Sequence, residues 1–374
     1  MKLLILDQFS EPGGAQQALV ELLPAMRERG WEALVGIPGD GPLFSQIAAV
    51  GFAASRVDCG PYHPGRKSLA DVFRFVRGMP HLAGQVRYMA HKVRADLIYV
   101  NGPRLLPSVA RLGVPVLFHS HSYIAGGVAR RLAGEALRRA DASVIAACRY
   151  VAAPWTNYVK PGRIRVIYNG VTGSPHIVAR HRGMLRVGCV GRIAPEKGQR
   201  EFLRAATIIH RALPHCRFVV SGAPLFADAR AQRYAARVRF EAADLPVEFT
   251  GWLADPRLAL AGLDLLLVPS TGPEATTRVI LEAYAAGVPV IAFPTGGIPE
   301  VAGVSAGLLA SSIEQMAALA IQLLAGSAEQ QERLSEAARE EWLRRFTLER
   351  YHQDVLAAIG CAVTGAAPRE LTSA

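Results

Sequence analysis

The stretch "DLLLVPSTGPEATTRVILEAYAAGVPVIAFPTGGIPEV", residues 264–301, alternates two kinds of pattern. Its short apolar runs, "DLLLVPS" and "PVIAF", predict buried strands, and the amphipathic stretch between them predicts a helix. The second run leads into the pair Gly296 and Gly297, which is typical of a loop. Strand, helix and strand in this order favour a parallel βαβ unit.

The same alternation extends over the whole chain and divides into two series of strands. The Gly- and Pro-containing segment around residues 170–184 separates them and is interpreted as a linker. A chain of 374 residues exceeds the roughly 250 to 300 residues at which a single core stops growing. We therefore predict an α/β protein with two doubly wound Rossmann-like domains facing a cleft. The predicted boundaries are 1–172 and 173–351, with a C-terminal helix at about 352–374 that packs back on the first domain.

Composition narrows the class of protein. The five cysteines are scattered and show no CxxC spacing, which argues against a disulfide framework or a zinc site and favours a reducing cytoplasm. The opening "MKLLILDQF" reaches Asp7 too early for a signal peptide, and no stretch approaches the ~18 to 20 apolar residues of a spanning helix. We expect a cytoplasmic protein.

The basic excess lies in the first half of the chain. Residues 1–182 hold 23 Lys and Arg against 11 Asp and Glu, whereas residues 183–374 hold 19 against 20. The excess is dense between residues 65 and 94, where a single acidic residue, Asp71, faces seven basic ones: Arg66, Lys67, Arg74, Arg77, Arg87, Lys92 and Arg94. Such a cluster is either a solvated helical face or a surface that attracts phosphates. Nucleic acid is the less favoured partner, because no nucleic-acid-binding motif accompanies the charge; peripheral contact with anionic membrane is the alternative.

Two glycine-containing segments follow predicted strands and are candidates for binding a phosphorylated ligand. Gly13 and Gly14 in "DQFSEPGGAQQ" let the backbone approach a ligand closely ahead of a helix start, although a purely structural turn is equally compatible. Arg192 and Lys197 in "VGRIAPEKG" offer a guanidinium fork and a point charge that suit a diphosphate leaving group. A surface ion pair between these cations and Glu196 or Glu201 is the alternative.

Two carboxylates, Glu274 and Glu282, stand eight residues apart in "PEATTRVILEAYAAG". In one continuous helix they would lie ~12 Å apart along the axis and point about 80° apart, so they converge only if Glu274 lies on a loop. Glu274 would then accept hydrogen bonds from sugar hydroxyls and Glu282 from a ribose. Thr276 or Thr277 would cap the helix, whose first N–H groups would face phosphates. A salt bridge within the helix is the alternative role for Glu282.

Two histidines, His119 and His121, end the run "PVLFHSH" and share one strand face by alternation. We favour His121 as the one that reaches the ligand, because it is closer to the loop. A metal site is the alternative, but no third ligand pattern accompanies the pair, so none is expected.

Taken together, "PGGAQ", "RIRVIYNGV", "VGRIAPEKG", "FTGW", the E-x7-E spacing and "GGIPE" resemble, in order, the retaining family 4 glycosyltransferases of GT-B fold. The resemblance implies that Arg192 and Lys197 grip the donor diphosphate. It assigns Glu274 to the transferred sugar and Glu282 to the ribose, and it places Gly13 and Gly14, with a histidine, near the reacting sugar.

The resemblance also implies where the nucleotide binds: Trp252 and Leu253 would lie near the base, with Ser221 and Gly222 on the preceding strand end. Thr277 stands where the family usually has glycine, which leaves the identity of the sugar open. The expected reaction moves a sugar from a UDP- or GDP-sugar to a glycan or lipid-linked acceptor, without cofactor or metal, in the synthesis of cell-surface polysaccharide or glycolipid. A GT-B sugar-nucleotide epimerase and a non-catalytic sugar-nucleotide binder are the alternatives.

Overall fold

The computed structural model forms two compact units, Met1–Tyr168 with Tyr351–Ala374 (unit 1) and Asn169–Arg350 (unit 2). The described residues are 1–11, 13–59, 69–173, 184–224, 229–253, 255–302 and 307–365. Most of the predicted linker, residues 174–183, lies outside them, as do Arg66 and Lys67. Within the described parts, no helix is both long and apolar enough to cross a membrane.

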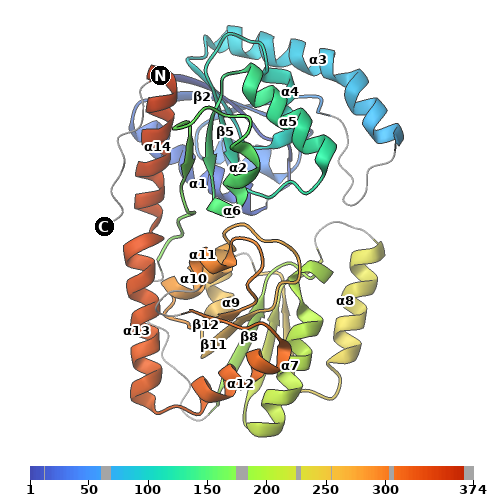
Figure 1. The fold of residues 1–374 in the computed structure, drawn as a ribbon, viewed down its shortest axis with the longest axis vertical. Helices are drawn as coiled ribbons and strands as arrows, with labels where there is room; N and C mark the ends of the chain where they lie inside the picture. The colour runs from blue at the N-terminus through green and yellow to red at the C-terminus, as the bar shows by residue number, and fades with distance from the viewer. Residues whose placement is uncertain are drawn as a thin grey trace. The chain divides into compact units, whose positions relative to one another are not determined.

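Unit 1 is built on a seven-stranded parallel sheet with the order β3-β2-β1-β4-β5-β6-β7. Its strands are β1 Lys2–Leu6, β2 Glu32–Ile37, β3 Ala53–Arg56, β4 Leu97–Val100, β5 Val116–Ser120, β6 Ser143–Ala146 and β7 Ile164–Val166. The central strands are buried throughout, because helices cover both faces of the sheet (Figure 1). This is why they read in the sequence as continuous apolar runs rather than as alternating ones.

The helices of unit 1 are α1 Gly14–Glu28, α2 Pro42–Ala49, α3 Leu69–Val93, α4 Leu106–Val109, α5 Gly127–Arg139, α6 Arg149–Ala152 and most of α14 Leu348–Thr364, with short 3-10 turns at Pro103–Leu105 and Ala153–Trp155. Trp155 is fully buried in the core of the unit. Its ring lies edge-on to that of Phe118, with the ring centroids 5.5 Å apart, and its Nε1 donates to Ser120 Oγ at 3.0 Å. The indole therefore fills the core without leaving its N–H unpaired.

Unit 2 contains a six-stranded parallel sheet with the order β10-β9-β8-β11-β12-β13. Its strands are β8 Arg186–Val190, β9 Arg217–Ser221, β10 Val247–Gly251, β11 Leu265–Val268, β12 Val290–Ala292 and β13 Gly307–Leu309. Its helices are α7 Gln199–Ala212, α8 Ala229–Glu241, α9 Pro256–Leu260, α10 Arg278–Ala285, α11 Ile298–Val301, α12 Ile313–Leu324 and α13 Ala328–Arg345, with a 3-10 turn at Pro195–Lys197. The predicted fold class, two doubly wound Rossmann-like α/β domains, is confirmed.

The stretch at residues 264–301 forms β11, α10 and β12, as its pattern predicts. Helix α10 ends at a glycine because Gly287 adopts φ +69°, a left-handed conformation that other residues rarely take. The N–H of Gly287 donates to Tyr284 O and that of Val288 to Ala283 O, which satisfies two carbonyls of the last turn. This turn returns the chain directly into β12.

Candidate functional site

In unit 2, loops that follow β8 and β11 bring a lysine and a glutamate together. Lys197 Nζ donates to Glu274 Oε1 at 2.7 Å, and Ser270 Oγ donates to the same oxygen at 3.0 Å. Glu274 lies four residues ahead of α10, on a loop as the spacing argument required. Its side chain is 15% exposed, so the ion pair is partly shielded from water. The two strands are neighbours in the sheet, and their carboxyl ends are where doubly wound sheets bind ligands.

Glycines allow these loops to pack against each other. Gly198 has φ +72°, and a Cβ at this position would lie 1.8 Å from Pro269 O. Gly296 has φ +59°, and its Cβ would lie 2.1 Å from Glu274 O, while the N–H of Gly297 donates to that same oxygen at 2.9 Å. The glycine-rich loop after β12 therefore holds the backbone of Glu274 in place.

Arg192 lies on the same loop as Lys197 and is paired with Glu196. Its Nη2 lies 2.6 Å from Glu196 Oε1. This is the surface ion pair that the sequence analysis gives as the alternative to diphosphate binding. The side chains of this pair are 33% and 45% exposed, so both remain in contact with solvent. Gln199 Nε2 donates to Arg192 O at 2.9 Å and ties this loop to the start of α7.

The start of α10 differs from the predicted cap. Thr277 is the N-cap residue, but its side chain makes no capping hydrogen bond, and Thr276 Oγ1 instead accepts from Asn169 Nδ2 at 2.9 Å. The predicted N-cap position is therefore confirmed at Thr277, whereas the capping hydrogen bond expected from a threonine side chain is not formed. Both threonines are buried, so their side chains are committed to packing, while the first N–H groups of the helix are left to other acceptors. Inside α10, Glu282 lies 3.6 Å from Arg278 Nε, the helical ion pair considered as its alternative role.

The predicted nucleotide-binding residues lie at the ends of β9 and β10. Gly222 has φ +144°, and a Cβ there would lie 1.9 Å from Gly191 O, so this turn requires glycine. Ser221 is buried and accepts from Thr250 Oγ1 at 2.8 Å. Trp252 is 55% exposed and Leu253 is partly exposed, which leaves an indole face open to solvent beside the strand ends.

In unit 1, Gly13 and Gly14 begin α1 directly after the loop that follows β1. Gly13 is extended, with φ −140°, and is the N-cap residue, so it adopts no conformation that only glycine allows. A Cβ at Gly13 would nevertheless lie 2.8 Å from Gln16 Oε1. The absence of a side chain at this helix start is the feature that suits close approach of an anion.

The two histidines of unit 1 stack on each other, with ring centroids 3.8 Å apart. His119 is buried and its Nδ1 is hydrogen-bonded to Tyr99 OH, whereas His121 is partly exposed and its Nε2 lies 2.8 Å from Asn101 Oδ1. Burial, with a smaller effect of His121, lowers the pKa of His119 well below its usual 6.5, so this ring is neutral. His121 is thus the one of the pair that reaches the surface of unit 1.

Behind the histidines lies a buried polar cluster that the sequence did not single out. Asp7 is fully buried and accepts hydrogen bonds from Gln16, Asn101 and the N–H of Phe9. Burial raises the pKa of Asp7 to about 6, against the opposing effect of these donors. The sequence does contain a signal for this cluster, because Asp7 and Asn101 each directly follow an apolar strand run, in "KLLILD" and "DLIYVN".

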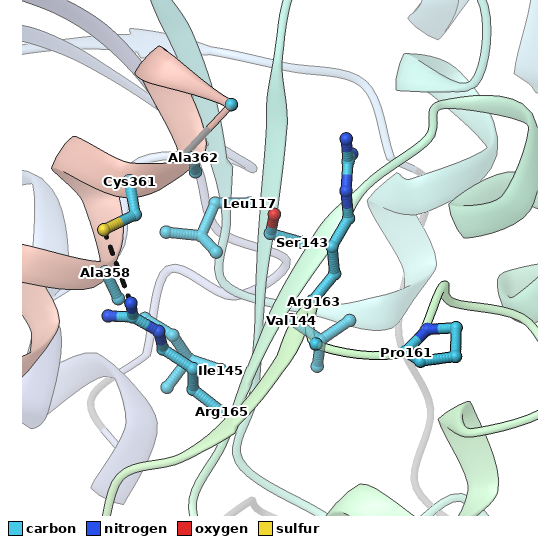
Figure 2. A pocket seen from close by; sticks show the side chains of 12 residues that line it. Leu117, Ser143, Val144, Ile145, Pro161, Arg163, Arg165, Ala358, Cys361 and Ala362 are labelled. Atoms are coloured by element: carbon cyan, nitrogen blue, oxygen red, sulfur yellow. Dashed lines mark hydrogen bonds between the residues drawn. The ribbon is translucent and has the colours of Figure 1, made fainter. Parts of the chain in front are cut away.

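A separate hollow in unit 1 lies between the β5–β7 edge and α14, with a volume of about 180 Å³ (Figure 2). It opens at the amino ends of these strands, where Ser143 and Arg163 line it, rather than at the carboxyl ends that carry the histidines. Arg165 donates to Cys361 Sγ at 3.3 Å and Arg163 is paired with Asp141. The residues predicted to form the functional site are not among those that line this hollow.

No group of three or more His, Cys, Asp or Glu side chains in the described part of the chain is arranged to hold a metal ion. Each unit has its own set of strand-end residues: Lys197, Ser270 and Glu274 in unit 2, and Asp7, Asn101 and His121 in unit 1. Such a set can bind a phosphorylated, hydroxyl-rich molecule.

The class of protein follows from the family matches together with the fold. Residues 12–172 match the family described as Glycosyltransferase Family 4, and residues 185–326 match Glycosyl transferases group 1. With the two Rossmann-like units, these matches place the chain among the glycosyltransferases of GT-B type.

Individual relatives make the comparison more specific. HepE of Anabaena, solved in complex with UDP, is 25% identical over 96% of this chain and 100% of its own, with a TM-score of 0.80. The GDP-mannose-dependent monoacylated alpha-(1-6)-phosphatidylinositol monomannoside mannosyltransferase of Corynebacterium glutamicum is 31% identical over 37% of either chain. The D-inositol 3-phosphate glycosyltransferase of Segniliparus rotundus is 32% identical over 50% of this chain and 48% of its own. The chain thus matches about a third to a half of the length of these two curated relatives.

Proposed function

We propose that the protein is a retaining glycosyltransferase that moves a sugar from a nucleotide diphosphate sugar to an acceptor hydroxyl. The observation that carries this proposal is the contact between Lys197 and Glu274 at the carboxyl ends of β8 and β11, with Arg192 on the same loop as Lys197. Two cations suit a diphosphate, and a carboxylate beside them suits the hydroxyls of the attached sugar.

Arg192 and Lys197 would stabilise the leaving diphosphate. Each unit charge pair at ~4 Å and an effective dielectric near 20 is worth about 4 kcal/mol before desolvation. Binding a diphosphate would exchange the Arg192–Glu196 pair for a guanidinium–phosphate pair, and an exposed ion pair of this kind contributes only about 0 to 1 kcal/mol. The existing ion pair is therefore a small obstacle to the proposed role.

The rest of the donor would be held by residues of unit 2 in separate roles. Glu274 would accept from the transferred sugar and Glu282 from the ribose, while the N–H groups at the start of α10 would face the phosphates. The base would lie near the ends of β9 and β10, against Ser221, Gly222, Trp252 and Leu253. HepE, which was also solved with UDP-glucose, and the GDP-mannose-dependent relatives support a UDP- or GDP-sugar as donor.

Transfer would proceed on the front face of the sugar. The departing diphosphate would accept the proton of the acceptor hydroxyl, so the reaction needs no covalent nucleophile and no cofactor. Gly13, Gly14 and His121 of unit 1 would approach the reacting sugar. Stabilisation of developing charge by Arg192, Lys197 and helix N–H groups would then supply most of the rate enhancement.

The acceptor is proposed to be lipid-linked and to be met at an anionic membrane surface, as in cell-surface glycolipid or polysaccharide synthesis. Helix α3 exposes Phe73, Val76 and Tyr88, by 64%, 57% and 67% respectively, among the basic residues Arg77 and Arg87. A helix that exposes both apolar and basic side chains binds the interface of anionic bilayers. The phosphatidylinositol mannosides named among the acceptors of relatives support this choice.

Two substitutions in unit 2 test the proposed transfer. Glu274→Ala is expected to lower kcat by at least about 100-fold while nucleoside diphosphate still binds, because the carboxylate contacts the sugar. Arg192→Ala is expected to weaken nucleoside diphosphate binding by about 10-fold, since it removes a charge-assisted contact. Binding is measured by calorimetry with UDP and GDP, and turnover with the corresponding sugar donors.

Arg204→Ala serves as the matched control, because Arg204 is an exposed arginine of α7 in the same unit. It should leave both binding and turnover unchanged. Retained turnover in Glu274→Ala together with unchanged affinity in Arg192→Ala would contradict the assignment. A separate measurement, of the anomeric configuration of the product, tests the retaining mechanism. An inverted configuration would reject it.

A further inference from the structure

Three neighbouring strands of unit 1 end in side chains that form one hydrogen-bonded row. Asp7 follows β1, Asn101 follows β4, and His121 follows β5. Asn101 Nδ2 lies 2.6 Å from Asp7 Oδ2, and Asn101 Oδ1 lies 2.8 Å from His121 Nε2. The row runs from a buried carboxylate to a partly exposed imidazole.

The carboxylate decides the direction of every hydrogen bond in the row. An ionised carboxylate only accepts, so Asn101 must turn its NH2 group towards Asp7. The carboxylate also accepts from Gln16 Nε2, at 2.9 and 3.1 Å, and from the N–H of Phe9 at 2.9 Å. The Oδ1 of Asn101 then faces the imidazole, and a carbonyl oxygen can only accept. His121 Nε2 must therefore carry the hydrogen of this bond.

The stacked ring of His119 fixes the plane of His121. The two rings lie 29° from parallel with centroids 3.8 Å apart, and the neutral state of His119 avoids repulsion between them. Tyr99 OH holds His119 from the other side through its Nδ1. One in-plane hydrogen bond and one stacking contact together determine the orientation of an imidazole.

We propose that Asp7 and Asn101 are positioning residues that hold His121 in the tautomer with its hydrogen on Nε2. In this tautomer Nδ1 carries the lone pair, which is the form that accepts a hydrogen bond from a sugar hydroxyl. The inference rests on the proposed function and deepens it, since it assigns the ligand-facing chemistry of His121 to residues that lie behind it.

The burial of Asp7 argues against a purely structural role. A carboxylate without solvent exposure is costly to bury, and an apolar side chain of similar size would fill the space at lower cost. We therefore expect the carboxylate of Asp7 to have a function that depends on a group that only accepts hydrogen bonds. That function is to fix the tautomer of His121 through Asn101.

The test reads the tautomer of His121 in the full-length protein by 15N NMR after labelling its histidines, with the signal assigned by comparison with His121→Gln. In the unsubstituted protein, the ring is expected to carry its proton on Nε2. Asn101→Leu and Asp7→Leu are expected to give a mixture of both tautomers. Asn101→Leu should also lower kcat by about 10- to 100-fold with the donor KM changed less than about twofold, as for residues that orient a ligand-contacting histidine.

Gln16→Leu is the matched control, because Gln16 is buried and donates to the same carboxylate but has no bond to His121 in this row. It should keep the single tautomer. If the leucine variants do not fold, Asp7→Asn decides: an amide can present either end to Asn101, so both tautomers are expected.

A proton on Nδ1 in the unsubstituted protein, or an unchanged single tautomer in every folded Asp7 and Asn101 variant, would overturn the proposal. A mixture of tautomers with unchanged kcat would overturn its catalytic part. A protein that shows the expected tautomers but transfers no sugar would instead reject the proposed function, so the two failures are distinguishable.

Discussion

At the scale of single residues, Gly198 is the clearest point at which backbone geometry supports the site. Gly198→Ala is expected to lower the free energy of unfolding by more than about 2 kcal/mol, because the left-handed φ costs 1 to 2 kcal/mol and the new Cβ would meet a backbone carbonyl that cannot move aside. Gly251→Ala is the control, since Gly251 has φ +74° in the same unit but open space around it. Urea unfolding that gives equal losses for both variants would contradict the steric argument.

Asp7 gives a second prediction, on pH. Its folded-state pKa of about 6 lies above the ordinary 3.8, so the folded protein holds this proton more tightly than the unfolded chain does. The stabilising contribution is therefore present at low pH and is lost as pH rises through about 6. Asp7→Asn should remove this dependence, so the unfolding free energy of the variant relative to the unsubstituted protein should fall by about 1 kcal/mol from pH 7.5 to pH 5. A difference that is the same at both pH values would contradict it.

Residue types at strand ends could be predicted from the sequence, whereas their partners could not. Lys197 and Glu274 were each identified, yet their contact joins residues 77 positions apart and depends on β8 and β11 being neighbours. Asp7 was missed because a single acidic residue after a strand is ambiguous until Asn101 is placed beside it. Local pattern determines the element, and strand order determines the pairs.

At the scale of elements, strands, most helices and the position at which α10 starts followed from the sequence pattern, but the hydrogen bonds of its cap did not. Two threonines ahead of a helix satisfy the sequence rule for a cap, yet Asn169 engages Thr276 and packing buries Thr277. Tertiary contacts thus replaced the local capping preference.

The prediction for an element concerns membrane binding by helix α3. Its exposed aromatic and basic side chains should bind vesicles that contain about 30% anionic lipid, and binding should weaken at high salt because the charges are exposed. The double substitution Phe73→Ser with Tyr88→Ser should reduce co-sedimentation with these vesicles by at least about 10-fold, since it removes the inserted apolar area. Phe240→Ser on α8 is the control, because Phe240 is an aromatic residue of unit 2 that is 82% exposed. Equal binding by all three proteins would reject the membrane proposal.

At the scale of the whole molecule, the chain forms two units with separate cores, and the two units differ in net charge. Unit 1 holds 22 Lys and Arg against 13 Asp and Glu, whereas unit 2 holds 20 against 18 and is close to neutral. A basic unit and a neutral unit suit different partners, and the proposed donor site lies in the neutral one. If the proposed donor site is correct, binding of a nucleoside diphosphate would depend on local groups such as Arg192 and Lys197 rather than on net charge.

This dependence leads to a prediction for the whole chain. A ligand present at 100 times its Kd stabilises the state that it binds by about 2.7 kcal/mol. In hydrogen exchange of the full-length protein, UDP or GDP should therefore slow exchange in unit 2, around the loops after β8 and β11 and the start of α10. The amides of β1, β4 and β5 in unit 1 should keep their rates, because the proposed diphosphate contacts lie in unit 2. At the same ligand concentration, Arg192→Ala should keep only about half of this stabilisation, about 1.4 kcal/mol, because its affinity is expected to be about 10-fold lower, and Arg204→Ala should keep all of it. Protection confined to unit 1 would place the nucleotide in the wrong unit and overturn the assignment.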